Sequence, residues 1–305
     1  MTDQFTEQER VEKTEKTYDH VLISVSNPHT ADQLIRLGRL ITNPSSVLHI
    51  MNVTTESSFP KRMSSWRKST KLVTEMTHLS MSMGRLARPL ASTAKSIPDA
   101  ILRASKDTAA DLIIMGWFGR VTPLAVKKSR VVNKILHKAA CDTAVLKFRG
   151  KLQDINRLVL PVGLNFNSER LAVIKALRET SAKNVMLVQV RTPGMKKKEE
   201  EAGNILNRQA RELDEPVEVR VIRASSVVEG ILSVIKEDDL IVIGPGREWV
   251  FNRFLFGLRA DKITNRSPCS VLMYKSREMH VQSWLKGLLK AIWLRIKGAG
   301  GETRP

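Results

Sequence analysis

The chain contains little cysteine, with two residues in 305. Cys141 and Cys269 cannot supply a disulfide framework, and so low a count suits a reducing compartment. No apolar run approaches the roughly 18 residues that a membrane-spanning helix needs. Residues 1–17 are charged and polar, without the apolar core of a signal peptide. We therefore expect a cytoplasmic protein, either free or attached to the periphery of a membrane.

Catalytic signatures are missing as well. The six histidines are scattered, and His137 and Cys141, four positions apart, have no further ligands nearby that would complete a zinc site. The sequence contains no G-x-S-x-G motif and no Ser/His/Asp arrangement. We therefore expect neither an enzyme nor a metalloprotein.

Aromatic residues are scarce, at 5% of the chain, although the net charge is +19. Such a charge favours anionic partners: phosphates, nucleic acid or an acidic membrane face. A basic stretch at residues 61–71 surrounds Trp66, but no nucleic-acid-binding module is recognisable, and a solvated helix face explains the stretch equally well. We therefore expect no nucleic-acid partner.

What the chain does contain is a long internal repeat. The sequence DLIIMG at residues 111–116 reappears 128 positions later as DLIVIG at residues 239–244, and the correspondence continues to Cys141 and Cys269. A period this long indicates tandem domains, because solenoid units run to roughly 20–50 residues. Each cysteine precedes an apolar run at the same position of the repeat, so we expect both to be buried as apolar side chains.

Apolar runs alternate with helical patterns in both halves. In the first half, residues 31–41 have the apolar spacing of a helix with Thr30 as its N-cap, and residues 54–65 have the polar composition of a loop. The strands expected in this half are residues 20–26, 47–53 and 86–92, the repeated run ending at Gly116, and residues 143–148.

This alternation predicts two tandem α/β domains of the flavodoxin-like class. Each domain is expected to be a five-stranded parallel sheet with helices on both faces, and the two are expected to pack as an intramolecular pseudo-dimer. The expected organisation is a disordered lead at residues 1–17, a first domain at 18–150, a second domain at 151–276, and a basic amphipathic C-terminal helix and tail at 277–305.

A glycine-containing loop follows the repeated strand in each half. Glycines at this place let the backbone approach a phosphate, and the N–H groups at the start of the next helix can hold the anion. Ligands of parallel sheets bind beyond the carboxyl ends of the strands, where these loops lie. The candidate residues are Gly116, Gly119, Ser129 and Arg130 in the first half, and Gly244, Gly246 and Gly257 in the second half.

These motifs resemble the universal stress protein family in tandem form, over about residues 18–276. The resemblance rests on the strand that opens each half, on DLIIMG-x-x-GR at residues 111–120, and on NKIL at residues 133–136 leading to Cys141. It implies an ATP site built from G-x-x-G, nine residues and Gly-Ser, with an Asp after the first strand on the nucleoside side. It also implies a homo-oligomer formed through a universal-stress-type interface.

The match to that nucleotide motif is partial. Ser129-Arg130 stands where Gly-Ser is expected, and Arg247 takes the place of the second glycine in the second half. The expected Asp is Ser26 in the first half and Gly163 in the second. Two hypotheses therefore remain. Either the first half binds ATP or a related nucleotide, with Ser26 near the nucleoside and a regulatory rather than chemical role, or both loops are inherited turns.

A narrower resemblance favours a second function. SNPHT at residues 26–30 and CDTAVL at residues 141–146 look like the stress-protein-type domains associated with amino-acid and cation–chloride transporters. Those modules often lack the full ATP motif. The alternative function is thus a nucleotide-free interaction module that regulates a membrane transporter in trans.

The C-terminal tail has its own pattern. Between residues 281 and 297, Trp and Leu fall on one helical stripe with Lys on the opposite side, which is typical of an interfacial membrane helix. A helix docked on the protein or on a partner gives the same pattern. The residues that would contact an anionic membrane surface or a partner are Trp284, Lys286, Leu288, Lys290, Trp293, Arg295 and Lys297.

Overall fold

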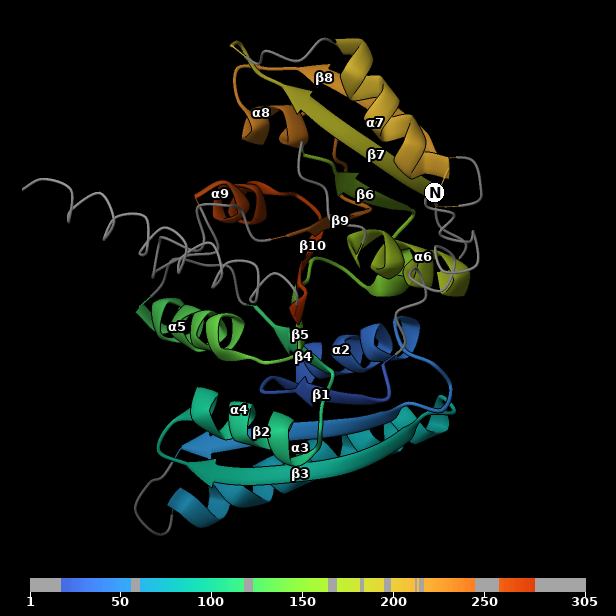
Figure 1. Ribbon diagram of the computed structural model, residues 1–305. Coiled ribbons are helices and arrows are strands. Elements are labelled where there is room, and N and C mark those ends of the chain that lie inside the picture. The colour runs from blue at the N-terminus through green and yellow to red at the C-terminus, as the bar shows by residue number, and fades with distance from the viewer. Residues whose placement is uncertain are drawn as a thin grey trace, which may run out of the picture.

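Figure 1 shows a computed structural model of the chain. It describes residues 18–55, 61–117, 123–163, 169–181, 184–194, 199–211, 213, 217–244 and 258–277. The strands are β1 (His20–Ser24), β2 (Val47–Thr55), β3 (Leu86–Ala94), β4 (Leu112–Gly116), β5 (Asp142–Lys147), β6 (Arg157–Pro161), β7 (Asn184–Arg191), β8 (Glu218–Arg223), β9 (Asp239–Ile243) and β10 (Ser270–Lys275). The helices are α2 (Pro28–Leu40), α3 (Lys61–Ser82), α4 (Ile97–Asp107), α5 (Pro123–Lys138), η1 (Leu152–Asp154), α6 (Glu169–Ser181), α7 (Glu199–Arg211), α8 (Val227–Leu232) and α9 (Leu258–Arg266).

These strands form one continuous sheet rather than two separate ones. The order is β3-β2-β1-β4-β5-β10-β9-β6-β7-β8, so each half contributes five strands. Every neighbouring pair within a half is parallel, whereas β5 and β10, the last strand of each half, pair antiparallel at the centre. In Figure 1 the first half lies below and the second above, with β5 and β10 between them. The expected flavodoxin-like class and the pseudo-dimer packing are confirmed.

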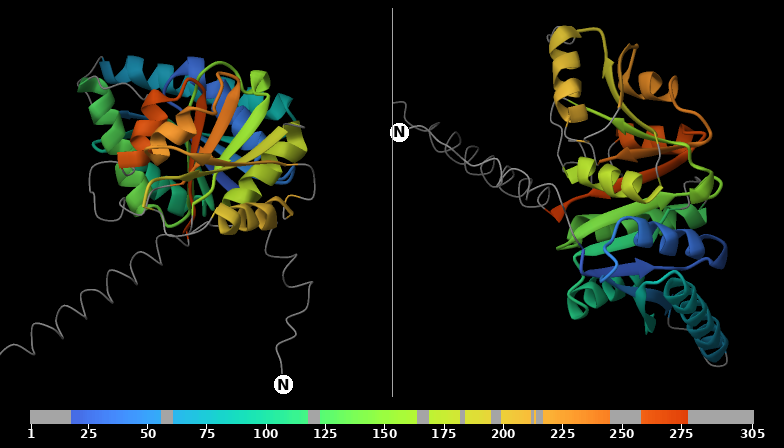
Figure 2. Two further views of the ribbon diagram at one scale, coloured as in Figure 1. Left: turned by 90° about the horizontal axis from the view of Figure 1, so that it is seen from above. Right: turned by 90° about the vertical axis from the view of Figure 1, so that its right-hand side faces the viewer.

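Helices cover both faces of this sheet, as Figure 2 shows from two further directions. One buried cluster joins the sheet to α2, α3, α6 and α7, and the other joins it to α4, α5, α8 and α9. Val21 and Ile23 belong to the first cluster and Leu22 to the second, as the alternation of side chains along a strand requires. Because both faces are covered, the inner strands such as β4 and β9 read as continuous apolar runs, whereas the edge strands β3 and β8 contain polar residues.

The first helix begins earlier than its apolar spacing predicts. Asn27, not Thr30, is the N-cap: its side-chain oxygen accepts a hydrogen bond from the backbone N–H of His29 at 3.1 Å. Pro28 then fills the first helical position, where its missing N–H costs nothing. The next helix, α3, likewise begins at Lys61, inside the stretch that was predicted to be a loop.

An ion pair connects the two helices that follow one another on the same face of each half. Lys134 on α5 lies 2.7 Å from the carboxylate of Asp99 on α4. In the second half Arg266 on α9 lies 2.5 Å from Glu229 on α8. Both pairs are at least one-third exposed, so each contributes little to stability. They connect corresponding helices of the two halves, although Lys134 corresponds in the repeat to Lys262 and not to Arg266.

Gly230 on α8 has no room for a side chain. A Cβ at this position would lie 2.5 Å from Cγ1 and 2.8 Å from Cγ2 of Val190, and 3.1 Å from Cβ of Ala224. Valine is stiff about its first side-chain torsion, so it cannot move its methyl groups away at low cost. We expect Gly230→Ala to lower the free energy of unfolding by about 1–3 kcal/mol, measured by urea titration.

Gly203 on α7 is the matched control for this substitution. A Cβ there would meet nothing within 4 Å. Because alanine is the better helix former, we expect Gly203→Ala to raise the free energy of unfolding by up to about 1 kcal/mol. Equal effects at the two glycines would show that the close approach of α8 to β7 is not what requires Gly230.

Candidate functional site

The carboxyl edge of the first half brings two of the predicted residues together. Ser26 lies two residues after β1 ends, and Gly116 ends the neighbouring strand β4, with Ser24 and Met115 in register. The backbone N–H of Trp117 donates to the carbonyl of Leu146 at 2.8 Å and fixes the start of the glycine loop. Ser26 is exposed. The edge therefore presents one hydroxyl group beside one glycine.

The remaining first-half candidates are placed less favourably for a phosphate. Gly119 lies outside the described residues, and α5 begins at Pro123, six residues before Ser129. Only the first turn of a helix has N–H groups without intrahelical partners. The backbone of Ser129 and Arg130 therefore has no free donor for a phosphate.

A cavity of about 520 Å³ opens beside this edge, between the second half of β3, the middle of β2 and helix α4. Met51 on β2 lines it, and the carbonyl of Met51 accepts a hydrogen bond from the N–H of Val25, the residue before Ser26, at 2.8 Å. The cavity thus begins one strand away from Ser26. The sequence analysis did not predict this cavity. Ser96 and Pro98 at the start of α4 indicate the helix that forms one wall of the cavity, but not the cavity itself.

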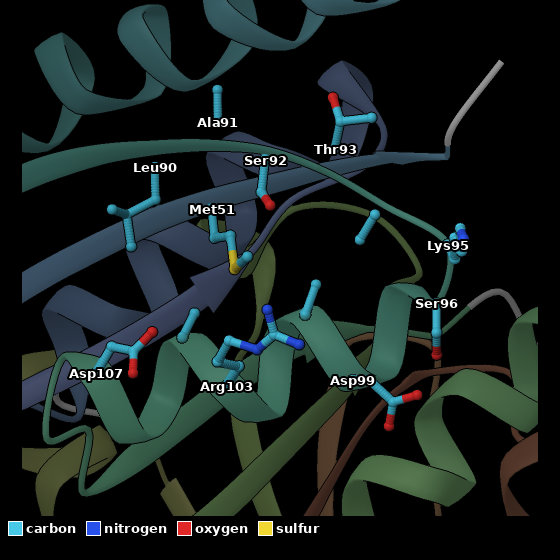
Figure 3. Close-up of a pocket in the computed structure, with 13 residues that line it drawn as sticks. Met51, Leu90, Ala91, Ser92, Thr93, Lys95, Ser96, Asp99, Arg103 and Asp107 are labelled. Carbon is cyan, nitrogen blue, oxygen red and sulfur yellow. The ribbon is translucent and has the colours of Figure 1, made fainter.

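The walls of this cavity are polar on both sides (Figure 3). On the strand side, the hydroxyl of Ser92 points from β3 toward α4. On the helix side, Arg103 rises from α4 toward Met51, with Asp99 and Asp107 at either end. The hydrogen bond from Lys134 keeps the pKa of Asp99 below its ordinary value, so this carboxylate is charged at neutral pH. A hydroxyl together with side chains of both charges suits a polar ligand that has donors as well as acceptors.

The second half presents a different edge. Arg170 on α6 lies over Gly244: a Cβ on this glycine would be 3.4 Å from Cδ and Nε of Arg170. A terminal nitrogen of the same guanidinium lies 3.5 Å from the carbonyl of Pro161, where β6 ends. The side chain of Arg170 therefore takes up the space beside Gly244. Gly246 and Gly257 lie outside the described residues.

The two aspartates of the repeated strand hold loops rather than a ligand. One carboxylate oxygen of Asp111 accepts the N–H of Asp19 at 2.7 Å, and one of Asp239 accepts the N–H of Lys236 at 2.7 Å. Asp239 also forms a double hydrogen bond with Arg157, at 2.8 and 2.9 Å. In both halves, therefore, the aspartate at the start of the repeated strand holds a neighbouring backbone segment in place.

Both cysteines are buried and free, as expected. Burial raises the pKa of the Cys141 thiol to about 11 and that of Cys269 to about 12. Neither forms a thiolate near neutral pH, so neither is a nucleophile or an activated metal ligand. Among the described residues, no group of three or more His, Cys, Asp and Glu side chains could hold a metal ion.

The terminal segments that carried further predictions lie outside the described residues. These segments are the lead at residues 1–17 and the tail from residue 278 onward, which contains Trp284, Lys286, Leu288, Lys290, Trp293, Arg295 and Lys297. Within the part of the chain that is described, no helix is long and apolar enough to cross a bilayer.

Comparison with known proteins gives a family, a curated relative and solved structures of the same fold. A family model, described as the universal stress protein family, matches residues 17–147 and 170–275. The Na(+)/H(+) antiporter NhaS5 of Synechocystis sp. is 23% identical over 267 residues, which cover 83% of this chain and 38% of the antiporter. The chain thus spans well under half the length of this curated relative.

Two solved structures share the fold. A universal stress protein from Archaeoglobus fulgidus superposes with a TM-score of 0.60 at 16% identity, covering 85% of this chain and 96% of that one. The cytoplasmic domain of a prokaryotic cation chloride cotransporter gives a TM-score of 0.60 at 11% identity, with the same coverage. At such low identities these likenesses establish the architecture alone.

Proposed function

The chain belongs to the universal stress protein family, and we propose that it is a non-catalytic regulatory module that binds an adenine nucleotide such as ATP in its first half. The observation that supports this most is the carboxyl edge of that half, where Ser26 and Gly116 follow or end neighbouring strands and a cavity of about 520 Å³ begins at the next strand, β2. Strand ends of parallel sheets are where such ligands bind. The second half is the weaker candidate, because Arg170 takes up the space beside Gly244.

The nucleotide sets a state of the protein in this proposal and is not a substrate. A regulatory module needs a ligand that binds and dissociates readily, and an exposed Ser26 in place of an anchoring carboxylate favours weak, reversible binding.

The purified chain should be denatured, and any released nucleotide identified. ATP should then be titrated calorimetrically into the stripped protein. Absence of released nucleotide together with no heat at millimolar ATP would contradict the proposal.

Gly116→Ala tests the site without disturbing the fold. A Cβ at Gly116 would lie 3.7 Å from Cδ1 of Leu34, which is ordinary contact. We expect the variant to unfold at nearly the same urea concentration and to bind ATP at least about tenfold more weakly, because the methyl group keeps phosphate from the backbone. Gly163→Ala, where a Cβ meets nothing within 4 Å, is the control in the other half.

Ser26→Asp, which restores the acid that the family resemblance implies, should strengthen the binding of ATP.

A second candidate function, favoured by the similarity to NhaS5, is regulation of a cation transporter. We propose that the module acts in trans at the cytoplasmic face of such a transporter. Inverted membrane vesicles would be prepared from a host strain that lacks the gene for this protein. Their Na⁺-dependent proton flux would be measured with and without the purified protein. A change in rate that needs the chain supports this function, whereas equal rates and no sedimentation of the chain with the vesicles would contradict it.

A further inference from the structure

Exposed apolar side chains gather in one segment of the first half. Among the residues that the structure describes, the large apolar side chains that are exposed are Met63, Trp66, Met81 and Leu86, at 46%, 41%, 56% and 60%. Three of them lie on α3, and the fourth begins β3, the strand into which α3 leads. A single exposed apolar residue is ordinary, but a group on one element indicates a contact surface. In Figure 1 this segment lies at the lower end of the molecule, where β3 forms one edge of the sheet.

Helix α3 has one buried side and one exposed side. Leu72 and Val73 belong to the buried cluster that joins the helix to the sheet. Met63 and Met81 are 18 residues apart, which is five full turns, so they lie on one line along the helix. Trp66 follows Met63 by three residues and neighbours it on the helix surface. The exposed apolar side chains of α3 therefore form one flank of the helix.

Positive charge lies beside this flank. Arg67, Lys68 and Lys71 are exposed on the side of α3 that faces away from the sheet. Over its whole length the helix contains five Lys and Arg residues and one acidic residue, Glu75. Glu75 lies 3.7 Å from Lys71, in an ion pair that is well exposed. The outward side of α3 is therefore basic, with apolar side chains along one flank.

The corresponding helix of the second half has a different surface. Helix α7 connects β7 to β8 as α3 connects β2 to β3. It begins with three glutamates and contains two arginines, so its own charge is negative where that of α3 is positive. In the described part of the chain, none of the exposed large apolar side chains belongs to α7. The basic and apolar surface is thus specific to α3 and is not a consequence of the repeated fold.

We propose that the outward side of α3 binds an anionic membrane surface. Trp66 and Met63 enter the interfacial layer, where the amphipathic indole ring is favoured, and the three cations lie at the level of the anionic headgroups. A nucleic acid would also attract the cations, but it would leave the methionines in water. The lipid surface matches both parts of α3, and the proposal depends neither on the nucleotide site nor on the C-terminal tail.

Flotation of the full chain with vesicles tests this surface. The vesicles would contain equal parts of phosphatidylserine and phosphatidylcholine, with phosphatidylcholine alone as the uncharged comparison. We expect binding to the anionic vesicles to weaken about fivefold for each cation removed, in Arg67→Gln and in the double variant Arg67→Gln/Lys68→Gln. Arg208→Gln/Arg211→Gln is the matched control, because it removes two exposed cations from α7. This control should bind as tightly as the parent.

A nitroxide label identifies which part of the chain touches the bilayer. Thr70 is exposed on α3, one turn after Trp66, and the native thiols are buried, so Thr70→Cys provides one accessible thiol among the described residues. On anionic vesicles we expect the label at this position to become less mobile and more accessible to dissolved oxygen, which concentrates in the bilayer. Asn207→Cys, at an exposed position on α7, should give the same spectrum with and without vesicles.

The outcomes separate the lipid surface from other partners. No flotation with anionic vesicles would overturn the proposal. Flotation with an unchanged spectrum at residue 70 would also overturn it, because another part of the chain would then make the contact. Met63→Ser should weaken vesicle binding about threefold or more, since it removes apolar contact. Binding to duplex DNA that is unaffected by Met63→Ser, without binding to vesicles, would assign the cations to a nucleic acid instead.

Discussion

Asp142→Ala is expected to lower the free energy of unfolding by about 3–5 kcal/mol, the largest effect that we predict for a single substitution in this chain. Asp142 is 2% exposed, and its carboxylate accepts three hydrogen bonds from groups far away in the sequence. Removing it leaves buried donors without their acceptor, which costs their full desolvation. Urea unfolding followed by circular dichroism measures this loss.

The three donors come from both ends of the folded body. The hydroxyl of Tyr18, just before β1, donates to one carboxylate oxygen at 2.7 Å, and the hydroxyl of Tyr274 on β10 donates to the same oxygen. The backbone N–H of Arg277 donates to the other oxygen at 2.8 Å. Burial, together with the neighbouring Tyr274 and Asp142, raises the pKa of Tyr18 well above its ordinary value, so its hydroxyl keeps its proton. One side chain of the first half therefore connects the start of that half to the end of the second.

Two variants calibrate this prediction. Tyr274→Phe removes one donor and leaves the carboxylate with the other two, so we expect a loss of only about 1–3 kcal/mol. Asp154→Ala removes an exposed carboxylate and should change the free energy of unfolding by less than about 0.5 kcal/mol. A loss for Asp142→Ala no larger than that of the exposed control would show that the three hydrogen bonds do not hold the halves together.

Much of the architecture followed from periodicity alone. The repeat of DLIIMG as DLIVIG identified β4 and β9, and the alternation of apolar runs with helical patterns predicted a parallel sheet in each half. The weak run at residues 86–92 proved to be β3, which ends at Ala94. The universal-stress-type resemblance is confirmed by the family match. These features were predictable because each depends on residues close together in the sequence.

The details that position the candidate sites depend on contacts between distant segments. No local pattern shows that Arg170, at the start of α6, lies over Gly244, or that Met51 and Arg103 line one cavity. The helix cap illustrates the same limit on a smaller scale: Asn27, Pro28 and Thr30 are all plausible helix starts, and only the hydrogen bond from His29 identifies Asn27 as the cap. Whether the glycine loops bind a nucleotide stays a prediction.

The junction of the halves contains the least predictable residues. Lys147 ends β5 and Lys275 ends β10, 128 positions apart, and both are buried although a lysine at a strand end reads as solvent-exposed. The ammonium group of Lys147 donates to the backbone carbonyl of Thr264 on α9, in the other half. Burial, with Arg149 nearby, lowers the pKa of Lys147 from 10.5 to about 8. Burial also lowers the pKa of Lys275.

This lowered pKa makes stability depend on pH in a definite direction. Between pH 8 and 10.5 the unfolded chain keeps the Lys147 proton that the folded chain has lost, so the free energy of unfolding rises with pH. The full shift corresponds to about 3 kcal/mol, present as a penalty below pH 8 and removed above pH 10.5. The thiols of Cys141 and Cys269 act in the opposite direction above pH 9, because their folded pKa values are raised.

Lys147→Met isolates the lysine contribution, since the cysteines are present in both proteins and cancel in the difference. We expect the variant to be more stable than the parent by about 1–3 kcal/mol at pH 7, because an apolar side chain avoids burying the charge and outweighs the lost hydrogen bond to Thr264. That gain should shrink as the pH rises from 8 through 10.5, because above pH 10.5 the parent amine is neutral in both states. Lys151→Met, at an exposed lysine, should give a curve parallel to the parent at every pH. A Lys147→Met curve that lies below the parent by a constant amount would mean instead that the contact between β5 and α9 stabilises the junction and that its buried charge costs nothing.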